Sequence, residues 1–139
     1  MIYLLTNAQK SPDELARFLI FVTKANRLVM PIFTIVAGAR PNFMKIAPII
    51  HAFQKKQAEG VNVQYRLVHT GQHYDKKMSG DFFDQLNIPE PNANLGGGGG
   101  TQAEQTAAIM VAFEKELMEN RPDLVIVVGD VTSTLACSI

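Results

Sequence analysis

The sequence predicts an α/β fold in which helices flank a parallel sheet. From Met30 onward, apolar runs rich in β-branched residues alternate with helical patterns at a spacing of about 30 residues, as in successive βαβ units. Two of these runs end in a glycine that is followed by a charged residue, at Gly38-Ala39-Arg40 and Gly129-Asp130. In an open parallel sheet, turns of this kind face the ligand crevice.

Residues 1–29 have a different pattern and are predicted to be an N-terminal extension. The segment 11–14, Ser-Pro-Asp-Glu, combines a capping box with a proline in the first helical turn. It predicts a helix that ends near Asn26. We expect the first strand of the sheet only after Met30, so removal of the extension should leave the fold of residues 30–139 intact.

The first βαβ unit begins with a predicted strand at 32–37 and a turn at Gly38. The helix that follows contains Pro48, which should kink or restart it. The next strand is expected at 61–70, where the alternation of apolar and polar residues is imperfect, as in a partly buried strand. The sequence then predicts a loop, a short helix and an irregular polar stretch, at residues 71–80, 81–86 and 87–94.

Five consecutive glycines, Gly96–Gly100, lead into a helix whose capping box is Thr101 with Glu104. The glycine run follows no strand and lacks a Gly-Lys-Ser/Thr ending, which excludes a dinucleotide fingerprint and a P-loop. A plain linker is favoured over a flap near the ligand. The last strand, at 123–128, has the clearest buried pattern. The apolar stripe of the helix that begins at Thr101 should comprise Ala103, Thr106, Ala107, Met110, Phe113 and Leu117.

Composition limits the classes of function. Hydrophobic residues make up 47% of the 139-residue chain, which is typical of a globular protein. Thirteen basic side chains balance thirteen acidic ones, so the sequence predicts neither nucleic acid nor an anionic membrane as a partner. No apolar stretch reaches the roughly 18 residues of a membrane span. The single cysteine, Cys137, favours a reducing, cytoplasmic location and is interpreted as a packing residue.

The turn after the first predicted strand suits a phosphate. Gly38 and Pro41 should leave backbone N–H groups exposed at the positive end of a helix dipole. Arg40 adds a planar bidentate donor, and the stem of Lys45 can reach back to the same place. A surface arginine and lysine on an ordinary turn is an equally good interpretation.

The turn after the last predicted strand presents a carboxylate, Asp130, which can serve as a general acid or base. A helix N-cap at Asp130 or Thr132 explains the same residues. The site interpretation is favoured because neighbouring strands would place Asp130 beside the turn that carries Arg40. None of the three histidines has metal-ligand spacing. One of His69 and His73 is expected to face the crevice.

Three motifs in this order resemble the N-terminal domain of the non-hydrolysing bacterial UDP-N-acetylglucosamine 2-epimerases. The resemblance covers residues 30–139. It implies a Rossmann-like domain that is an incomplete part of a two-domain GT-B architecture. The motifs are Gly38-x-Arg40-Pro41-x-x-x-Lys45-x-x-Pro48, Thr70-Gly71-Gln72-His73 and Gly129-Asp130-x-Thr132-Ser133-Thr134-Leu135-Ala136.

The resemblance also implies roles for particular residues. Arg40 and Lys45 match residues near the pyrophosphate of the sugar nucleotide, and Asp130 matches a catalytic aspartate. Gln72 and His73 match a segment that in some relatives helps to bind a second, regulatory substrate molecule. The residues after this segment depart from the family pattern, which leaves regulation open.

The implied activity interconverts UDP-N-acetylglucosamine and UDP-N-acetylmannosamine by elimination and re-addition of UDP. It needs no cofactor or metal, belongs to cytoplasmic polysaccharide biosynthesis, and implies a homodimeric full-length enzyme. Further catalytic groups would lie beyond Ile139, so we expect the 139-residue chain alone to be inactive. The alternatives are a hydrolysing epimerase, a non-catalytic gene fragment and a flavodoxin-like binding domain.

Overall fold

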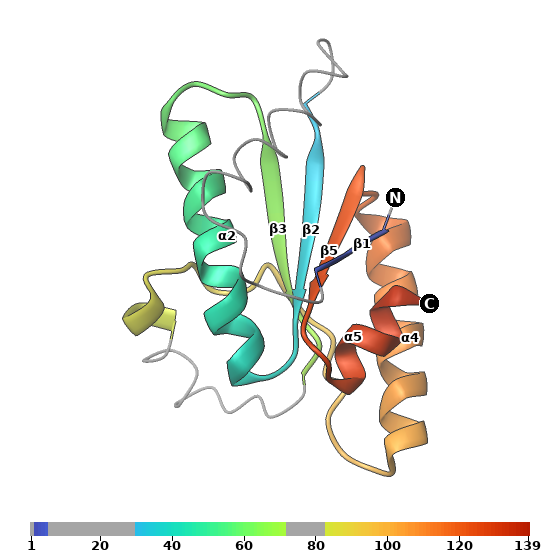
Figure 1. The fold of residues 1–139 in the computed structure, drawn as a ribbon. Helices are drawn as coiled ribbons and strands as arrows, with labels where there is room; N and C mark the ends of the chain where they lie inside the picture. Colours follow the sequence, from blue (N-terminus) through green and yellow to red (C-terminus); the bar gives the residue numbers. More distant parts are fainter. Residues whose placement is uncertain (1, 6–29, 72–82) are drawn as a thin grey trace.

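The computed structural model describes residues 2–5, 30–71 and 83–139, and within them one five-stranded sheet of order β1-β5-β2-β3-β4 (Figure 1). All paired strands run parallel, which confirms the predicted class. The strands are β1 (Ile2–Leu5), β2 (Ile32–Ala37), β3 (Gln64–His69), β4 (Ala93–Asn94) and β5 (Leu124–Val128). The helices whose bounds are fully described are α2 (Arg40–Ala58), α4 (Gln102–Glu119) and α5 (Thr132–Ser138). Residues 83–86 are also helical and fall within the short helix predicted at 81–86.

The sheet lies between two apolar clusters, because successive side chains of a strand point to opposite faces. In β5, Leu124 and Ile126 pack in the cluster beneath α2, whereas Val125 and Val127 pack in the cluster beneath α4 and α5. All five residues of β5 are buried. In Figure 1, α2 lies on one side of the sheet, and α4 and α5 lie together on the other. The result is a three-layer arrangement.

Helix α2 is continuous over 19 residues, so Pro48 does not restart the helix, and a kink at Pro48 stays a prediction. Pro48 is exposed, and so is Met44, whose carbonyl loses its helical donor to the proline. Pro48 and Met44, one turn before it, therefore lie on the solvent side of the helix. The buried side of the helix carries Ile46, Ile50 and Phe53 without interruption.

Helix α4 begins with the predicted capping box. The amide of Thr101 donates to the Glu104 carboxylate at 2.7 Å, and the amide of Glu104 donates to the Thr101 hydroxyl at 3.3 Å. The predicted stripe is partly wrong, since Ala103 and Ala107 are exposed. The fully buried residues of the helix are Ile109 and Phe113. A salt bridge of 2.9 Å from Arg66 to Glu116 joins β3 to α4.

Two segments differ from the sequence expectation. Strand β1 pairs with β5 from Ile2↔Val125 to Leu5↔Val128, so the expectation that the sheet begins after Met30 is wrong. Four residues are too short a run to be recognised as a strand by periodicity. Strand β4 lies within the stretch expected to be irregular and is held by pairing to the end of β3. The helix predicted at 11–26 lies outside the described residues, and the domain boundary at residue 29 stays a prediction.

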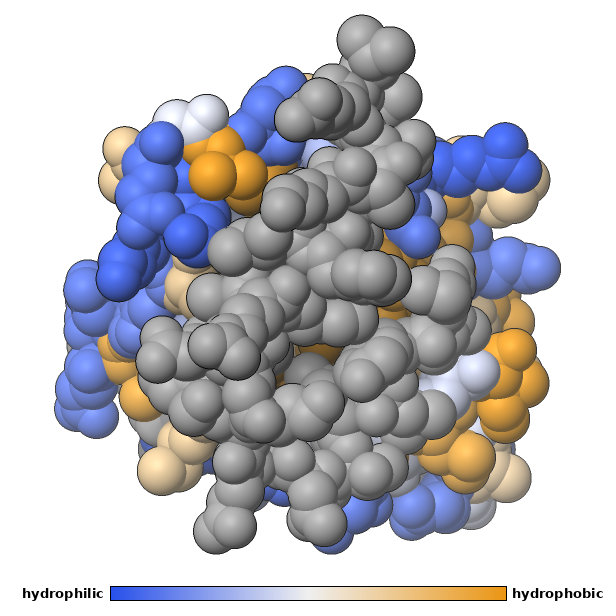
Figure 2. All heavy atoms as spheres, turned by 45° about the horizontal axis from the view of Figure 1, so that its top comes forward, coloured by the Kyte–Doolittle hydropathy of each residue, from blue (hydrophilic) through white to orange (hydrophobic). Residues whose placement is uncertain are grey.

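Several apolar side chains reach the surface beside α4 and α5, among them Val111, Met118, Leu135 and Ile139. Figure 2 shows apolar atoms on the right, the side on which Figure 1 places these helices. Among the described helices, none has the length and hydropathy required to cross a membrane.

Candidate functional site

The two predicted functional turns follow neighbouring strands. Strands β2 and β5 pair in parallel as far as Val36↔Val127, so both turns lie at the carboxyl edge of the sheet, at the bottom of Figure 1. Arg40 is the first residue of α2 and is exposed, and Lys45 is partly exposed one turn later. Asp130 is exposed at the end of β5. The expected adjacency of the two strands is confirmed.

Backbone amides of the first turn are hydrogen-bonded to a side chain that the sequence analysis did not identify, that of Asn42. The amides of Gly38 and Ala39 donate to Oδ1 of Asn42, at 3.2 and 2.9 Å. These two N–H groups are therefore paired within the protein, so the prediction that the backbone of this turn is open to a phosphate is wrong for Gly38 and Ala39. An anion at this turn would be bound by the side chains of Arg40 and Lys45. The sequence offers one indication of this role: asparagine in the first turn of a helix often bonds to nearby backbone groups.

The two turns interlock through their glycines. A Cβ on Gly129 would overlap Nδ2 of Asn42 in the first turn of α2. A Cβ on Gly38 would overlap Oγ of Ser133 at the start of α5 and lie 2.5 Å from Oγ1 of Thr70. Each strand therefore ends in glycine because the helix after the other strand approaches its backbone closely. Gly129 also has a φ of +95°, which favours glycine in its own right.

Helix α5 begins without a side-chain cap. Its N-cap residue is Val131, so the interpretation of Asp130 or Thr132 as the N-cap is wrong. The hydroxyl of Thr132 instead accepts a 2.6 Å hydrogen bond from Nε2 of Gln102, at the start of α4. Gln102 thus ties a third element to this edge. Asp130 has no capping role that would explain a carboxylate at this position.

The end of β3 adds His69 and Thr70 to the edge. His69 is 3% exposed, and burial lowers its pKa to about 4. Its Nδ1 accepts a 2.7 Å hydrogen bond from the amide of Gly71, and its ring stacks on Phe43 with the centroids 5.2 Å apart. His69 is therefore a neutral packing residue that does not face the crevice. Gln72 and His73 lie outside the described residues, and their roles stay predictions.

The glycine run packs against the end of β3, so its interpretation as a plain linker is wrong. The amide of Gly97 donates to the carbonyl of Thr70 at 2.8 Å, and Gly97 is buried against Ile109. A Cβ on Gly71 would lie 2.5 Å from the nitrogen of Gly97. Glycines allow these backbones to meet, which brings the start of α4 to the same edge as the two turns.

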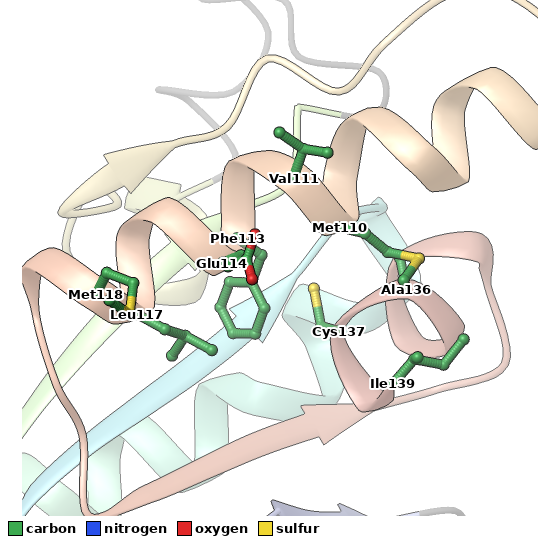
Figure 3. Close-up of a pocket in the computed structure, with 9 residues that line it drawn as sticks. All are labelled: Met110, Val111, Phe113, Glu114, Leu117, Met118, Ala136, Cys137 and Ile139. Atoms are coloured by element: carbon green, nitrogen blue, oxygen red, sulfur yellow. The ribbon is translucent and has the colours of Figure 1, made fainter.

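An apolar pocket of about 460 Å³ lies between α4 and α5 (Figure 3). Its lining includes Phe113, Leu117, Cys137 and Ile139, with Glu114 as its charged residue. Burial raises the pKa of the Cys137 thiol to about 12, which confirms this cysteine as a packing residue and not a nucleophile. None of the predicted site residues lines the pocket. Over residues 30–71 and 83–139, no cluster of three His, Cys, Asp or Glu could hold a metal ion.

Comparison with known proteins agrees with this arrangement. The family profile described as UDP-N-acetylglucosamine 2-epimerase matches residues 55–139, which is more than half of the chain. The chain belongs to the UDP-N-acetylglucosamine 2-epimerase family. The UDP-N-acetylglucosamine 2-epimerase of Methanocaldococcus jannaschii is 41% identical over 103 residues, which are 74% of this chain and 27% of that protein.

Other relatives within this epimerase family differ in the substrate they are named for. A UDP-2,3-diacetamido-2,3-dideoxy-D-glucuronate 2-epimerase of Pseudomonas aeruginosa is 40% identical over 107 residues, covering 77% of this chain and 29% of that protein. The chain therefore spans a little over a quarter of the length of these relatives.

The fold comparison agrees with the sequence comparison. The crystal structure of the M. jannaschii epimerase in complex with UDP-GlcNAc and UDP matches with a TM-score of 0.68 and 40% identity, over 76% of this chain and 28% of that one. The Neisseria meningitidis epimerase bound to UDP-GlcNAc matches with a TM-score of 0.64 and 28% identity, over 78% and 28%. These epimerases have a GT-B-like fold, and the predicted Rossmann-like sheet with flanking helices is confirmed.

Proposed function

We propose that this chain supplies the first part of an enzyme that epimerises a UDP-2-acetamido sugar at C2, with UDP-N-acetylglucosamine and UDP-N-acetylmannosamine as the interconverted pair. The observation that supports it best is the pairing of β2 with β5, which brings a turn with two cations beside a turn with a carboxylate. Relatives solved with UDP-GlcNAc bear the same fold over this region.

The chemistry accounts for the residue types. The hydrogen on C2 of the sugar is not next to a carbonyl, so simple removal and return of the proton is difficult. In the elimination route, the C2–H bond and the C1–O bond to UDP break while a C1=C2 double bond forms. UDP oxygen then adds back to C1, and a proton is delivered to the other face of C2. The net reaction consumes no oxidant, reductant or water.

Two tasks follow for the residues of this chain. Cations must stabilise the negative charge that develops on the departing pyrophosphate, which suits Arg40 and Lys45. A carboxylate must stand where it can move the C2 proton or support the group that does, which suits Asp130. The proposal also assigns Gln72 and His73 to substrate binding. It further holds that the full-length enzyme is a cytoplasmic homodimer.

A second substrate deserves equal testing because the P. aeruginosa relative, which is named for a diacetamido glucuronate, is about as similar as the M. jannaschii one. Both substrates have an acetamido group at C2 and UDP at C1, so the two turns would perform the same steps on either. The difference between them lies at C3 and C6 of the sugar.

The experiment is a chimera in which residues 30–139 replace the matching part of the M. jannaschii epimerase. In deuterated water, each substrate should yield its C2 epimer with deuterium at C2. Asp130→Asn should lower turnover by about 10²- to 10⁴-fold with nucleotide affinity little changed. Arg40→Ala should weaken UDP binding as well as slow elimination, because a cation at the pyrophosphate acts in both ground and transition states.

The outcomes separate the alternatives. Near-normal turnover of the Asp130→Asn chimera would remove Asp130 from the mechanism. Release of free N-acetylmannosamine with UDP would indicate the hydrolysing reaction. A folded chimera that is inactive on both substrates would favour a non-catalytic fragment.

A further inference from the structure

We infer that Asn42 is a positioning residue that holds the cationic turn after β2 against the turn after β5 that carries Asp130. This inference rests on the proposed function, because it assigns Asn42 the task of fixing how the two groups stand relative to one another. Asn42 itself is 1% exposed and does not reach the crevice.

One side chain makes hydrogen bonds to both turns. Its Oδ1 accepts from the amides of Gly38 and Ala39, the two residues that precede Arg40. Its Nδ2 donates to the carbonyl of Val128 at 3.0 Å, two residues before Asp130 and 86 residues away along the chain. The side-chain amide of Asn42 therefore connects the two functional turns directly.

Only an amide of this length can make both sets of bonds. Asparagine offers an acceptor and a donor on opposite sides of one planar group. Aspartate would keep the acceptor for the two amides but would place a carboxylate against the Val128 carbonyl. The Val128 carbonyl also accepts from the hydroxyl of Thr134 at 3.0 Å, so removal of either donor still leaves this oxygen bonded.

Thr134 therefore provides a matched control. It donates to the same carbonyl, at the same distance, and is also buried, but it belongs to α5, the helix that follows the second turn. Thr134→Val removes a hydrogen bond of the second turn alone. Asn42→Asp removes the bond between the turns while preserving the bonds within the first.

The test uses the 139-residue chain labelled with ¹⁵N and titrated with inorganic pyrophosphate. In the unaltered chain, the ligand should shift the amide resonances of Gly38 and Ala39 and also those of Gly129 and Asp130. In Asn42→Asp, the first pair should still respond, the second pair should not, and Kd should rise about tenfold, as expected for the loss of one hydrogen bond. Thr134→Val should keep both responses.

The possible results are distinct. If both variants lose the response of Gly129 and Asp130 equally, or if Asn42→Asp keeps it, the inference is overturned and Asn42 is only a structural residue. If pyrophosphate shifts neither turn of the unaltered chain, the assignment of this edge as an anion site fails, and the proposed function loses its support together with the inference. Thermal melting of each variant confirms that the comparison is between folded chains.

Discussion

The turns after β2 and β5 are neighbours that keep their shapes by different means. The first is held by hydrogen bonds, with the amides of Gly38 and Ala39 donating to Asn42. The second has no side-chain cap and depends on a glycine at positive φ, Gly129, whose space is limited by the same asparagine. Side-chain hydrogen bonds thus fix the backbone of the turn with the cations. In the turn with the carboxylate, the positive φ of a glycine is the main constraint. Loss of polar bonding should therefore have its larger effect in the first turn, and backbone strain should have its larger effect in the second.

The largest effect is expected from Gly129→Ala. An alanine there would have to adopt a φ of +95°, which L residues avoid, and its methyl group would overlap Asn42. The free energy of unfolding should therefore fall by about 3–5 kcal/mol. Gly60→Ala is the matched control, because Gly60 has a φ of +80° with nothing within 4 Å of the added methyl. It should lose only about 1–2 kcal/mol. Equal losses in urea unfolding would show that contact with Asn42 contributes nothing.

His69, at the end of β3, should make the free energy of unfolding depend on pH. Burial lowers the pKa of His69 to about 4 from an unfolded value of 6.5, so the unfolded chain binds more protons between these values. Stability from this residue is complete above pH 6.5 and should fall by about 2–3 kcal/mol as the pH drops to 4. His69→Gln should flatten that part of the stability profile. An unchanged profile would contradict the assignment.

Gly38→Ala tests space without strain and should have a smaller effect, about 2 kcal/mol. The added methyl meets Ser133 and Thr70, and the φ of Gly38 is not in the positive region. In a double-mutant cycle, Ser133→Gly should restore part of the loss, because it removes the nearest atoms. Additive losses in thermal melting would mean that the two turns do not touch through this pair.

Local patterns made much of the fold predictable. The Thr101–Glu104 capping box is confirmed because both of its bonds lie within four residues of sequence. Strand β5 was recognisable because a strand buried on both faces is a continuous apolar run. The two functional turns could be placed together because strand–helix alternation predicts that strands are parallel and that their ends share one edge.

Contacts that are distant in sequence could not be predicted in the same way. The bond from Asn42 to Val128 joins residues 86 positions apart, and nothing near Asn42 indicates its partner. The glycine run looked like a linker because its packing against Thr70 and Ile109 is tertiary. The stripe of α4 was assigned to exposed alanines because periodicity alone does not determine which apolar side faces the sheet.

The pairing of β1 with β5 has a consequence for how the sheet forms. Its register joins Ile2 with Val125 and Leu5 with Val128, so these contacts span almost the whole chain. During synthesis, residues 2–5 leave the ribosome long before their partner strand exists. Closing so long a loop is entropically costly, and contacts of this separation form late. β2 and β3, joined by one helix, can pair first, and the outer edge of β5 should be the last part of the sheet to be covered and the first to open.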